Sequence, residues 1–383
     1  MMKTIKNILK NTLLILISTL ITLIILEVLV RIFCNQGLYT VSQYPKQMFT
    51  SASPTQLTPN FEGDFPKSEI SGHIKINSKG IRDYERPYEK KGKFRILGLG
   101  DSFTFGHGVE FKEIFLTLLE DKLQKAKGDK VEVIKAGIPG IGPQEYLSVL
   151  KNYGVKYDPD VVLVNFFVGN DIFDIKLPSA EASKSDTAKK ADTVVLNSDE
   201  INGPSKVEGV NHFKDFLRRH VHLYSFVVDR IKTIPAIRHM LQKNNIANSI
   251  IGSYIIDILK KNYSDDYEKR WAEAFNCISK MKEICPNLVI VILPTREQVV
   301  PERLEKALKQ LDYKKVDIDI YKPNKKLSDY CVANNIKCID LLPEFEKSKD
   351  QLYFEIDPHF NLNGHKLAAD IIYNALIKDN LIN

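Results

Sequence analysis

Residues 95–108 read RILGLGDSFTFGHG, so a short apolar run leads directly into Gly100-Asp101-Ser102. A helical pattern follows, and we therefore expect Ser102 at the turn between a strand and a helix. A serine on such a turn exposes its hydroxyl beside free backbone N–H groups, as an acyl-transfer nucleophile and its oxyanion require. The alternative is that Asp101 or Ser102 only caps the helix.

A phosphate-binding glycine loop is the nearest rival for this stretch. Gly98 and Gly100 begin a dinucleotide-binding pattern, but Phe103 stands where its third glycine belongs. A Gly-Lys-Ser/Thr sequence does not follow, so a P-loop is also excluded. The sequence predicts a serine site without a cofactor.

Later segments have the order of an α/β fold. Residues 131–136 predict a strand, and the nearly all-apolar run at 161–168 predicts a strand that is covered on both faces. The turn after the first run contains Gly140, and Gly169-Asn170-Asp171 follows the second. Near the C-terminus, Asp357-Pro-His359 precedes a helical pattern. These residues fall at or near element ends, where an α/β sheet forms its ligand crevice.

With these motifs the chain resembles the SGNH (GDSL-type) hydrolase superfamily from about Phe94 to its end. The resemblance implies that Ser102 is the nucleophile and His359 the general base. It also implies that Gly140, Asn170 and the Ser102 N–H form the oxyanion hole. The fold expected is a three-layer α/β/α domain with about five parallel strands in flavodoxin-like order.

The final motif departs from the commoner Asp-x-x-His pattern, because Ile356 stands three residues before His359 and Asp357 only two. Side chains at i and i+2 share one face of an extended segment. Pro358 favours that conformation, since a residue before proline avoids the α region. We therefore assign Asp357 as the carboxylate that orients His359, with Glu355 as the alternative.

The N-terminus predicts a membrane anchor. Residues 12–33 are apolar, with only Glu27 and Arg31 charged, and these 22 residues approach the length that crosses a bilayer. Three lysines precede the span, so residues 1–11 are expected in the cytoplasm. The run is longer than a signal-peptide core and lacks an Ala-x-Ala-like site, which favours an uncleaved signal anchor over a cleaved peptide. Residues 76–83 resemble the lead-in of membrane-anchored members of the superfamily.

The chain divides into an anchor, a connecting region and an enzyme domain. Proline-containing residues 34–91 are expected to form a juxtamembrane spacer and lead-in that ends by packing on the catalytic domain. Residues 92–383 are expected to form the hydrolase domain, with an insertion at about 176–264. Within it, residues 177–210 lack aromatic side chains and predict a mobile loop. Residues 213–231 predict a helix whose basic face is solvated, or alternatively a lid or membrane contact.

Composition excludes several other classes of function. The 54 basic and 48 acidic residues give a net charge of +6 that is spread along the chain, so no nucleic-acid partner is expected. Neither the eight histidines nor the five cysteines have metal-ligand spacing, so no metal is expected. We expect His365 to pack or cap, and the cysteines to be buried free thiols, with one disulfide as the alternative.

Together these inferences predict a serine ester hydrolase or O-acyl (acetyl) transferase that works through a Ser-His-Asp acyl-enzyme. The expected location is the cytoplasmic (inner) membrane, single-pass, with the catalytic domain periplasmic or extracellular. The expected substrate is an acylated carbohydrate of the envelope, an expectation that rests on location and family analogy. The alternatives are a lipid or general carboxyl-esterase and a catalytically weak glycan-binding scaffold.

Overall fold

The computed structural model separates into two compact units, Met1–Val41 with Gly203–Ile250 and Ser42–Asn202 with Ile251–Asn383. The residues that the structure describes are 2–33, 44–50, 55–65, 70–177, 221–224, 226–227, 253–311, 313–355 and 357–382. The mobile loop expected at 177–210 lies outside them except for its first residue. Of the helix expected at 213–231, only 221–224 and 226–227 are described.

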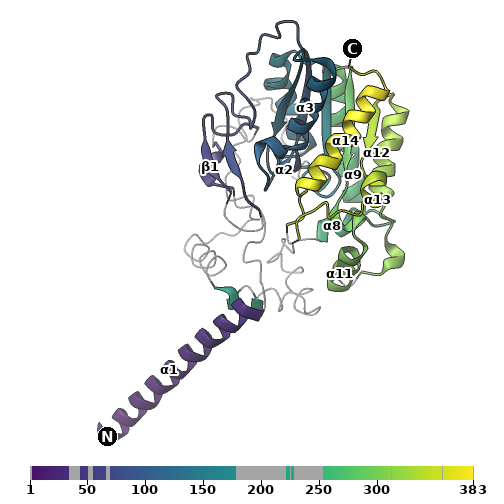
Figure 1. The fold of residues 1–383 in the computed structure, drawn as a ribbon. Coiled ribbons are helices and arrows are strands. Elements are labelled where there is room, and N and C mark those ends of the chain that lie inside the picture. The colour runs from purple at the N-terminus through teal and green to yellow at the C-terminus, as the bar shows by residue number, and fades with distance from the viewer. Residues whose placement is uncertain are drawn as a thin grey trace, which may run out of the picture. The chain divides into compact units, whose positions relative to one another are not determined.

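The second unit is built on a five-stranded parallel sheet with the spatial order β4-β3-β5-β6-β7 (Figure 1). Its strands are β3 (Phe94–Gly100), β4 (Val131–Gly137), β5 (Val161–Phe167), β6 (Leu288–Leu293) and β7 (Lys337–Asp340). Counted along the chain, the five strands have the order 2-1-3-4-5, which is the flavodoxin-like order. The expected five-stranded, flavodoxin-like α/β fold is therefore confirmed.

Helices cover both faces of this sheet and make it the middle of three layers. Neighbouring strand residues alternate between two cores, as Ile96 and Leu97 do on β3. Side chains on the Ile96 side pack against α3 (Phe115–Lys127), α13 (Leu342–Lys347) and α14 (Leu362–Lys378). Those on the Leu97 side pack against α4 (Pro143–Asn152), α9 (Asp265–Ile284), α11 (Pro301–Leu311) and α12 (Lys322–Ala333). Helices α3 and α14 lie side by side (Figure 1).

The shorter elements form turns and connections around the sheet. They are η1 (Lys46–Met48), β1 (Glu62–Asp64), β2 (His73–Lys75), α2 (Ser102–Phe105), η2 (Phe111–Glu113), η3 (Gly154–Tyr157), α8 (Ser253–Asp257), α10 (Arg296–Val299) and η5 (Lys315–Asp317). β1 and β2 pair antiparallel in a separate two-stranded sheet.

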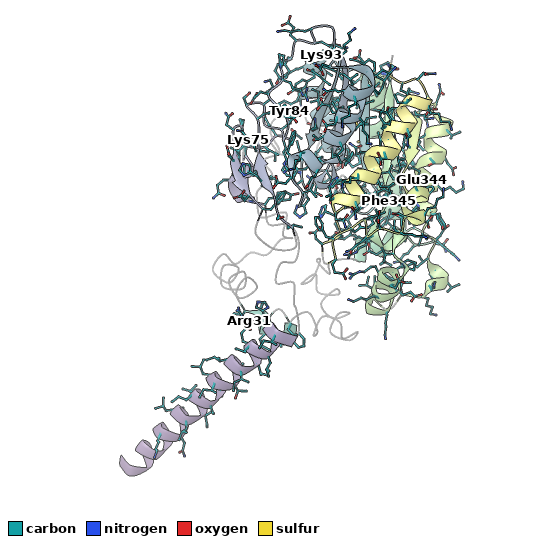
Figure 2. All side chains as sticks on the ribbon, viewed as in Figure 1. Arg31, Lys75, Tyr84, Lys93, Glu344 and Phe345 are labelled. Atoms are coloured by element: carbon teal, nitrogen blue, oxygen red, sulfur yellow. The ribbon has the colours of Figure 1, made fainter. Side chains whose placement is uncertain are left out.

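A buried ion-pair network lies where the lead-in meets edge strand β4. Lys135 on β4 donates to Glu120 at 2.7 Å and to Asp83 at 3.2 Å, and its side chain is only 1% exposed. Arg86 contacts both Glu120 oxygens, at 2.7 and 2.8 Å. Lys93, labelled in Figure 2, extends the network through Glu132 on β4. Removing one partner from such a group would leave a buried charge uncompensated.

Residues from Tyr44 to Lys91 belong to the same unit as the sheet, and their apolar side chains join its core. The buried guanidinium of Arg82 fastens this segment to the chain beyond α2. Its Nη1 donates to the carbonyls of Phe105 and Gly106, at 3.1 and 2.8 Å. Its Nη2 donates to His73 and Val109, at 2.7 and 3.0 Å. One side chain thus satisfies four backbone acceptors.

The first unit contains α1 (Met2–Phe33). Its stretch Lys10–Ile32, with a mean hydropathy of 2.9, is long and apolar enough to cross a membrane, and a signal sequence has the same features. Arg31, labelled in Figure 2, donates to Glu27 at 2.8 Å across one helical turn. Glu27 also accepts the backbone N–H groups of His222 and Leu223, at 2.9 and 2.7 Å. Sequence reasoning missed this second contact, because its partners are almost two hundred residues away.

We expect Arg82→Met to destabilise the second unit by about 3 kcal/mol or more, because four carbonyls lose a charged donor. The matched control is Lys75→Met on the same segment; this residue is labelled in Figure 2. The Lys75 side chain is 74% exposed and pairs loosely with Glu62, at 3.8 Å. Chemical denaturation of the two variants measures the difference. Equal midpoints for both variants would contradict a clamping role for Arg82.

Candidate active site

Ser102 is the first residue of α2 and follows β3 with one residue between them. Asp101 caps the helix, because its Oδ1 accepts the N–H of Phe103 at 2.9 Å. Gly100 has no room for a side chain, since a Cβ there would lie 2.0 Å from Oγ1 of Thr104. The strand-to-helix turn expected from the sequence is therefore present, and it is tight because glycine precedes it.

The structure brings the serine, the histidine and the aspartate together. Nε2 of His359 lies 2.7 Å from Oγ of Ser102, although the two residues are 257 positions apart. Nδ1 of His359 lies 2.6 Å from Oδ1 of Asp357, which also accepts the His359 backbone N–H at 2.9 Å. The alternative carboxylate, Glu355, is exposed and contacts Arg303 instead. Asp357 thus reaches His359 from the i−2 position.

Electrostatics keep Asp357 ionised inside the protein. Burial raises the pKa of Asp357, but the charge of His359 and the close imidazoles of His107 and His359 outweigh burial and hold that pKa below its usual range. The ring of Phe103 packs on His359 with 4.6 Å between ring centres. The imidazole therefore has a charged partner on one edge and an aromatic face beside it.

The two other expected oxyanion donors follow the strands on either side of β3. In register, Gly100 at the end of β3 pairs with Gly137 on β4 and with Asn165 on β5. Gly140 comes three residues after Gly137; its φ of +77° favours glycine, and it is exposed. Asn170 follows β5, and its Nδ2 donates to Oδ2 of Asp174 at 2.8 Å. Both residues thus lie beyond the carboxyl edge of the sheet, as Ser102 does.

Three carboxyl groups that sequence reasoning did not assign to the site gather behind it. Burial raises the pKa of Asp101 to about 6, and burial together with the Asp101 charge raises that of Asp174 to about 7. The same two causes raise the pKa of Asp171 well above its ordinary value. Asp171 accepts from the Tyr146 hydroxyl at 2.8 Å and from the Phe167 N–H at 3.1 Å. Two of the three, Asp101 and Asp171, lie in the Gly-Asp-Ser and Gly-Asn-Asp motifs. Their place in motifs already assigned to the site is the signal by which sequence analysis could have found them.

Two of the remaining histidines, His365 and His107, are buried near the site. His365 is buried, and its Nδ1 accepts the N–H of Phe115 at the start of α3, at 3.2 Å. Burial lowers its pKa to about 3, so it is neutral and serves as a cap, in agreement with the expected packing or capping role.

His107, Asp357 and His359 offer ligand atoms within 4.8 Å of one another. Because Ser102 and Asp357 already engage both nitrogens of His359, a metal held there would displace these hydrogen bonds.

No family model and no curated protein matches this chain. Among solved structures it is similar to a lipase/acylhydrolase from Enterococcus faecalis, with 14% identity, 75% of this chain and 96% of that chain covered, and a TM-score of 0.38. A member of the lipolytic protein G-D-S-L family from Veillonella parvula is 15% identical, and the alignment covers 74% of this chain and 99% of that chain with a TM-score of 0.36. An acetyl xylan esterase is 16% identical, and the alignment covers 74% of this chain and 100% of that chain with a TM-score of 0.36.

We expect the stability of the chain to fall between about pH 4 and pH 6 because of Asp101. Its folded-state pKa is raised to about 6, so above about pH 4 the folded carboxyl keeps a proton that the unfolded chain releases. Folding therefore becomes less favourable as the pH rises from about 4, and the loss is complete above about pH 6. The difference from the ordinary pKa value of 3.8 corresponds to about 3 kcal/mol. Asp101→Asn keeps the helix cap and removes this loss. Thermal melting should therefore show the variant more stable than the wild type at pH 7.5 and matched to it at pH 4.

Asp158→Asn serves as the control for this measurement, because Asp158 is 79% exposed and asparagine tolerates its left-handed backbone. It should leave melting unchanged at both pH values. An Asp101→Asn variant that is less stable than the wild type at pH 7.5 would show that the ionised carboxylate is stabilised by its surroundings.

Proposed function

We propose that this chain is an SGNH-type serine ester hydrolase in which Ser102, His359 and Asp357 are nucleophile, general base and orienting carboxylate. The observation that carries the proposal is the continuous hydrogen-bonded line from Ser102 Oγ through His359 to Asp357, with contacts of 2.7 and 2.6 Å. Such a line activates a serine hydroxyl, which is otherwise a weak nucleophile. The glycan-binding scaffold would have been favoured had this geometry failed.

The reaction proceeds through an acyl-enzyme. Nε2 of His359 takes the Ser102 proton as Oγ forms a bond to the ester carbonyl carbon, and the carbonyl oxygen becomes an oxyanion. The N–H groups of Ser102 and Gly140 and the amide of Asn170 stabilise that charge. The intermediate then expels the alcohol, which receives its proton from His359. A water molecule, activated by His359, finally cleaves the acyl group from Ser102, and a sugar hydroxyl in place of water would give O-acyl transfer. Throughout, Asp357 stays ionised and stabilises the imidazolium.

We further propose that the substrate is an acylated glycan of the cell envelope. The apolar helix α1 exposes its large side chains from Leu13 to Ile32, as a bilayer-spanning helix does. Three lysines precede the span, and by the positive-inside rule they support a catalytic domain outside the cytoplasmic membrane. There the mild net charge of +6 suits anionic envelope polymers. This substrate class rests on location, so it stands or falls with the topology.

We expect the full chain in detergent to hydrolyse p-nitrophenyl acetate and to be labelled on Ser102 by a fluorophosphonate. Ser102→Ala should abolish both activities, because the bond-forming oxygen is gone. Asp357→Asn should lower turnover by a factor on the order of 10⁴, since the imidazole of His359 would hold the wrong tautomer. The matched control is Glu355→Gln two residues away, which should retain activity because Glu355 contacts Arg303.

Undiminished labelling of the Ser102→Ala variant would place the nucleophile elsewhere. Activity that survives Asp357→Asn and is lost in Glu355→Gln would show that the two carboxylates have exchanged roles. Both comparisons require that the variants melt at the wild-type temperature.

Alkaline phosphatase fused to the C-terminus should be active, because this reporter folds only after export. The reporter activity should sediment with membranes. An inactive fusion would overturn the envelope-glycan substrate and favour a cytosolic lipid or small-ester substrate. Activity confined to the soluble exported fraction would show that the span is cleaved, with the chemistry unchanged.

A further inference from the structure

We propose that His107 is a positioning residue, whose imidazole holds the second carboxylate oxygen of Asp357 and fixes the orientation of that carboxylate toward His359. This inference rests on the proposed hydrolase function and extends the Ser-His-Asp line by one further member. His107 acts through Asp357, without touching the reacting atoms.

The geometry places Asp357 between two imidazoles. Its Oδ1 faces Nδ1 of His359 at 2.6 Å, and its Oδ2 faces Nε2 of His107 at 3.4 Å. The second distance is longer than an ordinary hydrogen bond, and catalytic hydrogen bonds in the absence of substrate are often long and tighten during the reaction. The two imidazole rings also pack on each other, with 4.3 Å between ring centres.

The surroundings of His107 would suit an apolar ring better than a polar one. The side chain is fully buried, with the rings of Tyr44 and Phe65 at 5.0 and 5.1 Å. Among the described residues, neither of its nitrogens has a hydrogen-bond partner that meets ordinary geometry. Burying an imidazole in this way costs free energy that phenylalanine would not cost. The contact with Asp357 is the interaction that an imidazole can make here and a phenylalanine ring cannot.

The charge state of His107 fits this role. Four ionisable groups face it: Asp357, His359, Arg82 and Tyr44. Burial first, and then the charge of His359, lower its pKa to about 4, although Asp357 opposes them. A neutral imidazole donates one N–H to the carboxylate and adds no positive charge that would compete with the His359 imidazolium. Asp357 therefore remains an anion whose stabilising field is directed at His359.

The test compares two variants of nearly equal shape in the full chain, His107→Gln and His107→Met. Glutamine keeps an N–H donor near the place of Nε2, and methionine does not. We expect His107→Met to lower kcat on p-nitrophenyl acetate by about tenfold or more with KM within about twofold, and His107→Gln to restore most of kcat. The acid limb of the kcat/KM profile should move in His107→Met only, because the Asp357 carboxylate then lacks its second donor.

Wild-type chain and Ser102→Ala are measured beside these variants, so that failure of the hydrolase function is recognised separately. If Ser102 proves essential while His107→Met keeps the wild-type kcat and pH profile, His107 only fills space and the proposal is wrong. Equal losses in both variants with an unmoved acid limb would also overturn it. Should His107→Met not fold, His107→Phe replaces it in the same comparison. Activity lost in a chelator and restored by zinc would assign the three groups to a metal instead.

Discussion

Parallel pairing of β3 with both β4 and β5 is the constraint on which the site depends. The pairing brings Gly100 opposite Gly137 on one side and opposite Asn165 on the other. Because parallel strands end at the same edge, the turns beyond them are neighbours whatever their separation in sequence. Ser102 lies on the turn after the central strand β3, and Gly140 and Asn170 lie on the turns after the flanking strands β4 and β5. Strand order therefore determines which turns meet, and the side chains on those turns determine the chemistry.

Much of this arrangement could be predicted because the strands are apolar on both faces. The strands expected at 131–136 and 161–168 agree with the observed strands within one residue at either end. The last helix begins at Leu362, three residues after His359, because the side chain of Asn361 accepts the N–H groups of Asn363 and Gly364. Caps of this kind extend a helix beyond its periodic part.

The candidate site divides in the same way. Ser102 and His359 lie in motifs with few alternatives, and the i+2 spacing was enough to select Asp357 over Glu355. His107 lies within the quoted motif, yet nothing local distinguishes it, because its partner is 250 positions away. The same holds for charged residues such as Arg82 and Lys135. Their burial depends on acceptors from distant segments, which periodicity does not record.

The Arg82 clamp has a consequence for where the chain can be cut without loosening the second unit. A protease that cut before Tyr44 would leave the clamp in place, because the segment that begins there belongs to the same compact unit as the sheet. A cut after Lys91 would let the clamping segment dissociate, and the carbonyls that follow α2 would lose their donor. The position of a cut would therefore determine whether the second unit keeps the donor that these carbonyls share.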